Sequence, residues 1–218
     1  MLEATERVVS SHDWITIVLM IIITLIVYAK LTDAERFHKL QLLMFNTSYI
    51  SEYSKATPLL FNFFNSVFLI IFTLISSLIL AIVLQRFNPE VNYLEIGYYL
   101  KIVSIVILFI IIRLVIGILL GILFESEKEQ QYLSFVKMSY LSNFCLIVTP
   151  LLIISIYSKS QAFTSFFTVI TLLLVTFYYF LILKNNQNFI FKRLFYFILY
   201  LCALEIAPFL VIYKLIVI

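Results

Sequence analysis

Two ionisable residues fall deep inside long apolar stretches of this sequence, far from either end, and they are the first candidates for a functional site. Arg113 lies in the stretch from Gly97 to Phe124, and Glu205 lies in the stretch that begins at Leu194. An ionised side chain deep in a membrane costs about 2.5 to 3.5 kcal/mol on insertion scales, so it marks a candidate site. Each residue lies eleven positions from one end of its stretch, which is about 16 Å along a helix.

Equal depth predicts that Arg113 and Glu205 pair, because a guanidinium binds a carboxylate through two hydrogen bonds and offsets its desolvation. Three interpretations stay open. The pair only fixes the register of two helices, or it forms a site for a ligand, lipid headgroup or partner subunit, or the two residues do not meet. Pro208 shares a helix face with Glu205 and frees the carbonyl of Leu204, so Glu205 beside a Pro208 kink is the best candidate site.

Small and amide side chains add candidate contacts between helices. Gly117 and Gly121 form a small-xxx-small step one turn beyond Arg113, a spacing that favours close helix packing. The candidate interhelical hydrogen-bonding groups are Asn62, Asn65 and Asn143. Asn62 and Asn65 lie near a membrane end, where simple solvation is the alternative.

Residue types for catalysis are sparse. The two histidines, His12 and His38, fall on opposite faces of the predicted membrane, and no zinc or phosphate-loop motif occurs. We predict no metal, no cofactor and no enzymatic activity.

The composition identifies the class of chain that must position these residues. Of its 218 residues, 63% are hydrophobic and 12% are charged, against about 25% charged in soluble domains. A soluble domain is therefore excluded. The net charge of +3 is small and dispersed, unlike that of a nucleic-acid-binding protein.

We expect an all-α, polytopic membrane protein: a single domain over 1–218 with a bundle of about six transmembrane helices, since a span needs about 20 apolar residues. The predicted spans are 14–31, 59–84, 97–124, 140–157, 162–183 and 194–216. Pro150 falls near the middle of the fourth span, where we expect a bend without a break.

The connection after the first span is predicted to hold an amphipathic interfacial helix over 32–46. Thr32 and Glu35 have capping-box spacing, and Phe37, Leu40 and Met44 recur at helical spacing with charged residues such as Arg36 elsewhere. The alternative is a continuous extension of the first span.

Lysine and arginine collect in cytoplasmic loops, and they predict the orientation. The three connections on one side carry nine, and the other side carries four. The nine are Lys30, Arg36, Lys39, Lys55, Lys128, Lys137, Lys184, Lys192 and Arg193, and the four are Arg7, Arg86, Lys159 and Lys214. Both termini are therefore predicted to be periplasmic.

The last span carries a recognisable segment, Leu201-Cys202-Ala203-Leu204-Glu205-Ile206-Ala207-Pro208. Its Leu-Cys-x-Leu-Glu-x-x-Pro core resembles the closing signature of a bacterial multi-pass inner-membrane family catalogued only as a domain of unknown function, the 4271 family. The resemblance implies a protein of the Gram-negative envelope with no established activity, and it places Glu205 in the family's most recognisable segment.

The leading functional expectation is a non-enzymatic inner-membrane subunit that scaffolds or assists an envelope complex, in contact with lipid and with other membrane or envelope proteins. The alternative is a small transporter or lipid-handling protein that uses an intramembrane Arg113/Glu205 site. An intramembrane enzyme is the third interpretation.

Overall fold

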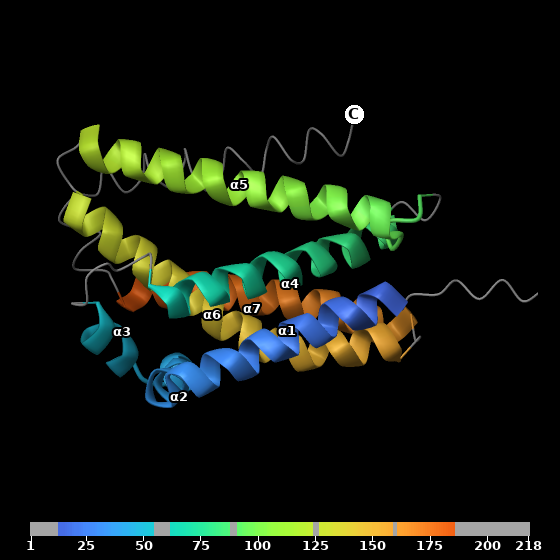
Figure 1. Cartoon of the computed structure of the whole chain (residues 1–218), viewed down its shortest axis with the longest axis horizontal. Helices are drawn as coiled ribbons and strands as arrows, with labels where there is room; N and C mark the ends of the chain where they lie inside the picture. Colours follow the sequence, from blue (N-terminus) through green and yellow to red (C-terminus); the bar gives the residue numbers. More distant parts are fainter. Residues whose placement is uncertain (1–12, 55–61, 88–90, 124–126, 159–160, 186–218) are drawn as a thin grey trace, which may run out of the picture.

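The computed structural model describes residues 13–54, 62–87, 91–123, 127–158 and 161–185, and within these ranges the chain is helical and has no strand (Figure 1). The all-helical class is confirmed. The helices are α1 (Asp13–Thr32), α2 (Ala34–Gln41), the 3-10 turn η1 (Leu42–Met44), α3 (Ser48–Tyr53), α4 (Phe63–Phe87), α5 (Ile96–Leu123), α6 (Glu127–Tyr157) and α7 (Gln161–Asn185).

Five of the described helices are long and apolar enough to cross a membrane, namely α1, α4, α5, α6 and α7. They correspond to the first five predicted spans. The sixth predicted span, 194–216, lies outside the described residues, and so do Glu205 and Pro208.

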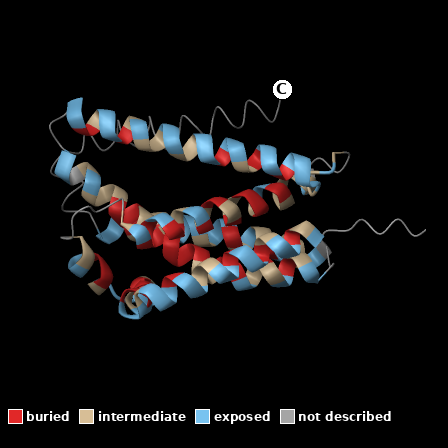
Figure 2. Ribbon diagram, in the orientation of Figure 1, coloured by how far each residue is buried: buried red, intermediate tan, exposed pale blue. Residues whose placement is uncertain are grey.

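Two helices, α4 and α6, form the centre of the bundle. The buried fraction of their most apolar stretch is 44% in α4 and 56% in α6, against 17% in α5. Figure 2 shows the same distribution, with buried residues gathered on α4 and α6 and most of α5 exposed. Apolar side chains exposed on α5 suit a lipid environment, because a bilayer solvates them as well as a protein core does.

The helix that carries the fourth span begins at Glu127, thirteen residues before the predicted start at residue 140. Polar residues between 127 and 139 lower the hydropathy there, so the sequence pattern predicts a loop in this segment. In the structure several of these side chains face the interior: Lys137 is only 8% exposed. The helix then continues through Pro150.

The connection after α1 also differs from its prediction. Asp33, and not Thr32, caps the next helix: its carboxylate accepts a hydrogen bond from the backbone N–H of Arg36 at 2.9 Å. Thr32 instead donates to the carbonyl of Tyr28 in α1. Because the chain leaves helical geometry at Asp33, the continuous extension of the first span is wrong, and the predicted single helix is divided into α2 and η1.

The short helix α2 is packed onto the bundle, where it contacts α1, α3 and α6. Phe37 and Leu40 are buried, as the helical spacing predicted, and Leu43 of η1 joins them while Met44 is only partly buried. Arg36 was predicted on the polar side of this helix, but it is 5% exposed. The reason is a set of aromatic rings from α3 and α4, described below.

Candidate functional site

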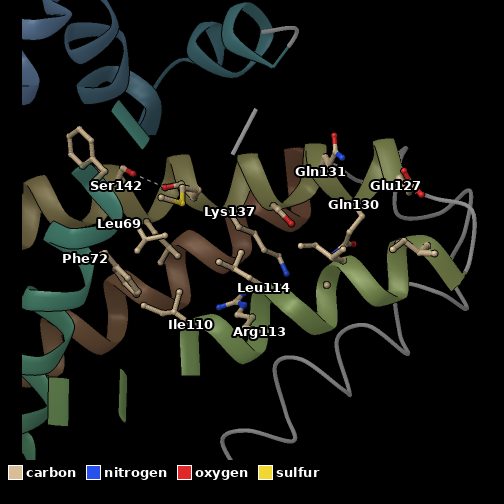
Figure 3. Close-up of a pocket in the computed structure, with 18 residues that line it drawn as sticks. Leu69, Phe72, Ile110, Arg113, Leu114, Glu127, Gln130, Gln131, Lys137 and Ser142 are labelled. Carbon is tan, nitrogen blue, oxygen red and sulfur yellow. Dashed lines mark hydrogen bonds between the residues drawn. The ribbon is translucent and has the colours of Figure 1, made fainter. Parts of the chain in front are cut away.

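A cavity of about 230 Å³ lies between α4, α5 and α6 (Figure 3). Its α4 wall is apolar and comprises Phe68, Leu69 and Phe72. The walls from α5 and α6 mix apolar with polar side chains. The polar and charged lining residues are Arg113, Glu127, Gln130, Gln131, Ser134, Lys137 and Ser142.

Two cationic side chains meet in this cavity at the same depth. Arg113 lies ten residues before the last residue of α5, and Lys137 lies ten residues after the first residue of α6. Only residues 124–126 separate the two helices in the sequence, and each cation is about 15 Å from that end of its helix. Figure 3 shows the two side chains extending toward each other across the cavity. Both also line a small adjoining recess with Tyr140 and Tyr178.

Gly117 and Gly121 follow Arg113 on the same face of α5, at four-residue spacing, and both are buried. They face Gln130 of α6: a Cβ at Gly117 would lie 3.0 Å from the amide Nε2 of Gln130, and one at Gly121 would lie 3.5 Å from its Cβ. The side chain of Gln130 therefore lies across both glycines. The close packing at this face is between α5 and α6 of the same chain.

Replacing Gly117 is expected to disrupt this contact in proportion to the size of the new side chain. In Gly117→Ala the flexible end of Gln130 moves by a few tenths of an ångström, and thermal stability in detergent changes by less than about 1 kcal/mol. In Gly117→Leu the added side chain must displace Gln130 and fill the cavity, so we expect a loss of about 1 to 3 kcal/mol. The control is Gly97→Leu, because a Cβ at Gly97 meets nothing within 4 Å. Equal stability of Gly117→Leu and wild type would contradict the packing role.

A second polar site surrounds Arg36, which sequence reasoning placed on a solvated face. Its Nε donates to the Tyr49 hydroxyl at 3.1 Å, and Nη2 donates to Oδ1 of Asn65 at 3.0 Å. The guanidinium also lies 4.9 Å from the ring centre of Tyr53 and 4.6 Å from that of Phe64. Burial raises the pKa of Tyr49, opposed by the Arg36 charge, so its phenol stays neutral. Cation–π contacts and hydrogen bonds thus compensate for the burial of this charge.

Asn143 connects three helices. Its amide nitrogen donates to the carbonyl of Leu40 at 2.6 Å and to that of Gln41 at 3.1 Å, at the end of α2. Its amide oxygen accepts a hydrogen bond from the Tyr178 hydroxyl of α7. The expectation that Asn143 and Asn65 form interhelical hydrogen bonds is confirmed by these contacts and by the bond from Arg36.

The exposed side of α2 carries an ion-pair cluster. Lys39 Nζ lies 2.6 Å from a Glu35 carboxylate oxygen and 2.8 Å from one of Glu52 in α3. The hydrogen bond from Lys39 lowers the pKa of Glu35, and the bond to Glu35 raises the pKa of Lys39. The cluster joins α2 to α3 at the surface. Among the residues that the structure describes, no group of three or more metal-ligating acidic, histidine or cysteine side chains occurs.

The long apolar helices and the buried polar groups between them define a polytopic, helical membrane protein. The chain belongs to the family described as "Domain of unknown function (DUF4271)", whose family model matches residues 15–216. The comparison with curated proteins finds no match, and neither does the comparison with solved structures. The segment from Leu201 to Pro208 lies outside the described residues, and its role stays a prediction.

Proposed function

We propose that this protein is a lipid-handling protein of the bacterial inner membrane that binds the anionic head of an amphiphile between Arg113 and Lys137. The observation that carries the proposal is the meeting of these two cations, from adjacent helices and at equal depth, in one cavity. Two like charges in a low-dielectric region repel each other, and an anion bound between them is attracted to both.

The rest of the cavity suits an amphiphile. The wall from α4 offers Phe68 and Phe72 as an apolar surface for a hydrocarbon chain, opposite the polar residues of α6. Binding sites for small molecules commonly combine an apolar lining with a few placed polar groups that fix orientation.

Charge bias supports a cytoplasmic position for the end of the bundle where α5 joins α6. Removing Lys137 from the predicted loops leaves eight basic residues on that side against four on the other, because nine minus one is eight. The bias keeps its sign, and the rule that cytoplasmic loops collect lysine and arginine favours the predicted orientation with periplasmic termini.

Glu205 enters the same proposal as the partner of Arg113. Its equal depth from the same membrane face supports the pairing. A carboxylate from the last span would then hold Arg113 in position while the Lys137 ammonium group donates hydrogen bonds to the ligand. The third interpretation, an intramembrane enzyme, receives no support from the described cavity.

The test is the composition of what purifies with the protein. From native membranes in mild detergent, we expect wild type to carry an anionic amphiphile at stoichiometric level, measured by mass spectrometry. Arg113→Gln and Lys137→Gln should each lower its occupancy about tenfold, because a hydrogen bond to a charged group contributes about 1.5 to 3 kcal/mol. Lys101→Gln is the matched control, since Lys101 is an exposed cation of α5 near the Tyr98 ring. Equal occupancy in all four proteins would overturn the proposal.

The second candidate is the non-enzymatic subunit that assists an envelope complex. The exposed apolar face of α5 favours it, because such a face can pack against the helix of a partner protein; Ile105, Leu108 and Ile112 are 59%, 57% and 48% exposed. The same purification tests this candidate. A stoichiometric protein partner, with no bound amphiphile, would support the subunit role and contradict lipid handling.

A further inference from the structure

We propose that the last span, 194–216, docks on the side of the bundle that lies between α5 and α7, where it brings Glu205 to Arg113. The inference goes beyond the proposed function, because it assigns a docking surface on the bundle and names its occupant. The span lies outside the described residues, and the described helices support this place for it through a recess, its charge and an apolar flank of α5.

The recess lies where three helices come together. Arg113 and Lys137 line the larger cavity, to which α4 contributes, and they also line the small recess, to which α7 contributes Val175, Tyr179 and Ile182. α5 and α7 both pack against α6, so a further helix placed over the recess contacts all three. The recess volume of about 20 Å³ is room for about one water, which is too little for a lipid head.

The charge of the recess favours a carboxylate. Among the described residues that line it, Arg113 and Lys137 are cationic and none is acidic. Glu205 is the one acidic residue of the last span, and a guanidinium binds a carboxylate through two hydrogen bonds. A carboxylate that reaches Arg113 from the α7 side leaves the cavity on the α4 side to the ligand, so this docking is compatible with the proposed function.

The chain that follows α7 can reach this side of the bundle. The amide of Asn185, the last residue of α7, donates to the Tyr140 hydroxyl at 2.7 Å, and Tyr140 lies thirteen residues, about 20 Å, from the start of α6. Residues 186–193 extend over at most about 29 Å, which covers that distance and keeps the span beside α7. A span that begins level with the end of α5 places Glu205 about 16 Å deep, and Arg113 is about 15 Å deep.

The flank of α5 beside Arg113 is apolar and suits a membrane helix. Phe109, Ile116 and Leu120 lie four, three and seven residues from Arg113, so they share its side of the helix. None of the three lines the larger cavity. Each is half-buried, whereas the neighbouring Leu119 is 53% exposed. The last span, which carries one carboxylate among apolar residues, matches a flank that carries one cation among apolar residues.

The direction of the span predicts which residues meet. The span starts level with the last residue of α5, so the two helices are antiparallel, and Ile198, seven residues before Glu205, faces Leu120, seven residues after Arg113. Counted from that end, the two positions agree in depth to within about 2 Å. Helices that pack about 8 to 10 Å apart bring facing Cα atoms within the range of about 4.4 to 6.8 Å that a disulfide needs.

Disulfide crosslinking in native membranes tests the docking. In a background with Cys145→Ala and Cys202→Ala, the pair Leu120→Cys/Ile198→Cys should form an intramolecular disulfide on mild oxidation. After denaturation and trypsin digestion, mass spectrometry should detect the two peptides that carry these positions as one linked species. Because the crosslink reports only where the span lies, its failure is distinct from the loss of bound amphiphile that would overturn the proposed function.

Two control pairs in the same background make the result decisive. Leu119→Cys/Ile198→Cys should lose the linked species, because Leu119 lies on the exposed face of α5. Gly121→Cys/Gln130→Cys should link, because a Cβ at Gly121 would lie 3.5 Å from that of Gln130, within disulfide range. The docking is wrong if the Leu120 pair stays unlinked while the Gly121 pair links, or if the Leu119 pair links equally. A disulfide-linked dimer would assign the surface to a second copy and would likewise overturn it.

Discussion

Glu205→Ala is expected to lower the free energy of unfolding by about 3 to 5 kcal/mol, the effect of removing one partner from a buried ion pair. The physical reason is that Arg113, about 15 Å from the end of α5, would lose the carboxylate that offsets its desolvation. Thermal unfolding in detergent measures the change. A variant with wild-type stability would contradict the pairing of Arg113 with Glu205.

The double variant Arg113→Leu/Glu205→Leu separates a structural pair from a binding site. If the pair only fixes helix register, replacing both charges by apolar groups restores stability, because the desolvation of two ions is removed as well. If Arg113 binds a ligand, stability returns but the bound amphiphile is still lost. Lys137→Met provides the control, because Lys137 lines the same cavity and tests whether any cation there gives the same effect.

Of the two cations that meet in the cavity, only Arg113 was predicted from the sequence as a site residue. Arg113 stood out because its neighbours are almost all apolar. Lys137 did not, since four polar residues between 130 and 137 made the segment resemble a loop. The information was present in another form: Gln130, Ser134 and Lys137 have helical spacing, and Lys137 is as far from the turn as Arg113. Spacing, and not mean hydropathy, identifies a polar face of a membrane helix.

Arg36 is a different case, because no local pattern predicts its burial. It lies between the buried Phe37 and the solvated Glu35, and its partners are Tyr49 and Asn65, thirteen and twenty-nine residues away. An arginine near a membrane surface ordinarily extends its guanidinium to water. Only the docking of α2 against α3 and α4 encloses it, and that is tertiary information.

The docking of α2 gives the second large expected effect, which falls on Asn143. Asn143→Leu should lower the free energy of unfolding by about 2 to 4 kcal/mol, because it leaves the carbonyls of Leu40 and Gln41 and the hydroxyl of Tyr178 without their buried partner. Tyr178→Phe removes one of these bonds and should cost about 1 kcal/mol. Thermal unfolding in detergent measures both changes.

Limited proteolysis shows whether the loss of stability in Asn143→Leu arises from the detachment of α2. Trypsin should cleave after Lys39 sooner in Asn143→Leu than in wild type, since the carbonyls that Asn143 binds are at the end of the helix that carries Lys39. Ser142→Ala is the control, because the hydrogen bond that Ser142 makes among the described residues is to Met138 within α6, and its loss should leave the cleavage rate unchanged. If Asn143→Leu is destabilised while Lys39 stays protected, α2 is held by its apolar contacts, Phe37 and Leu40, and Asn143 serves the pairing of α6 with α7.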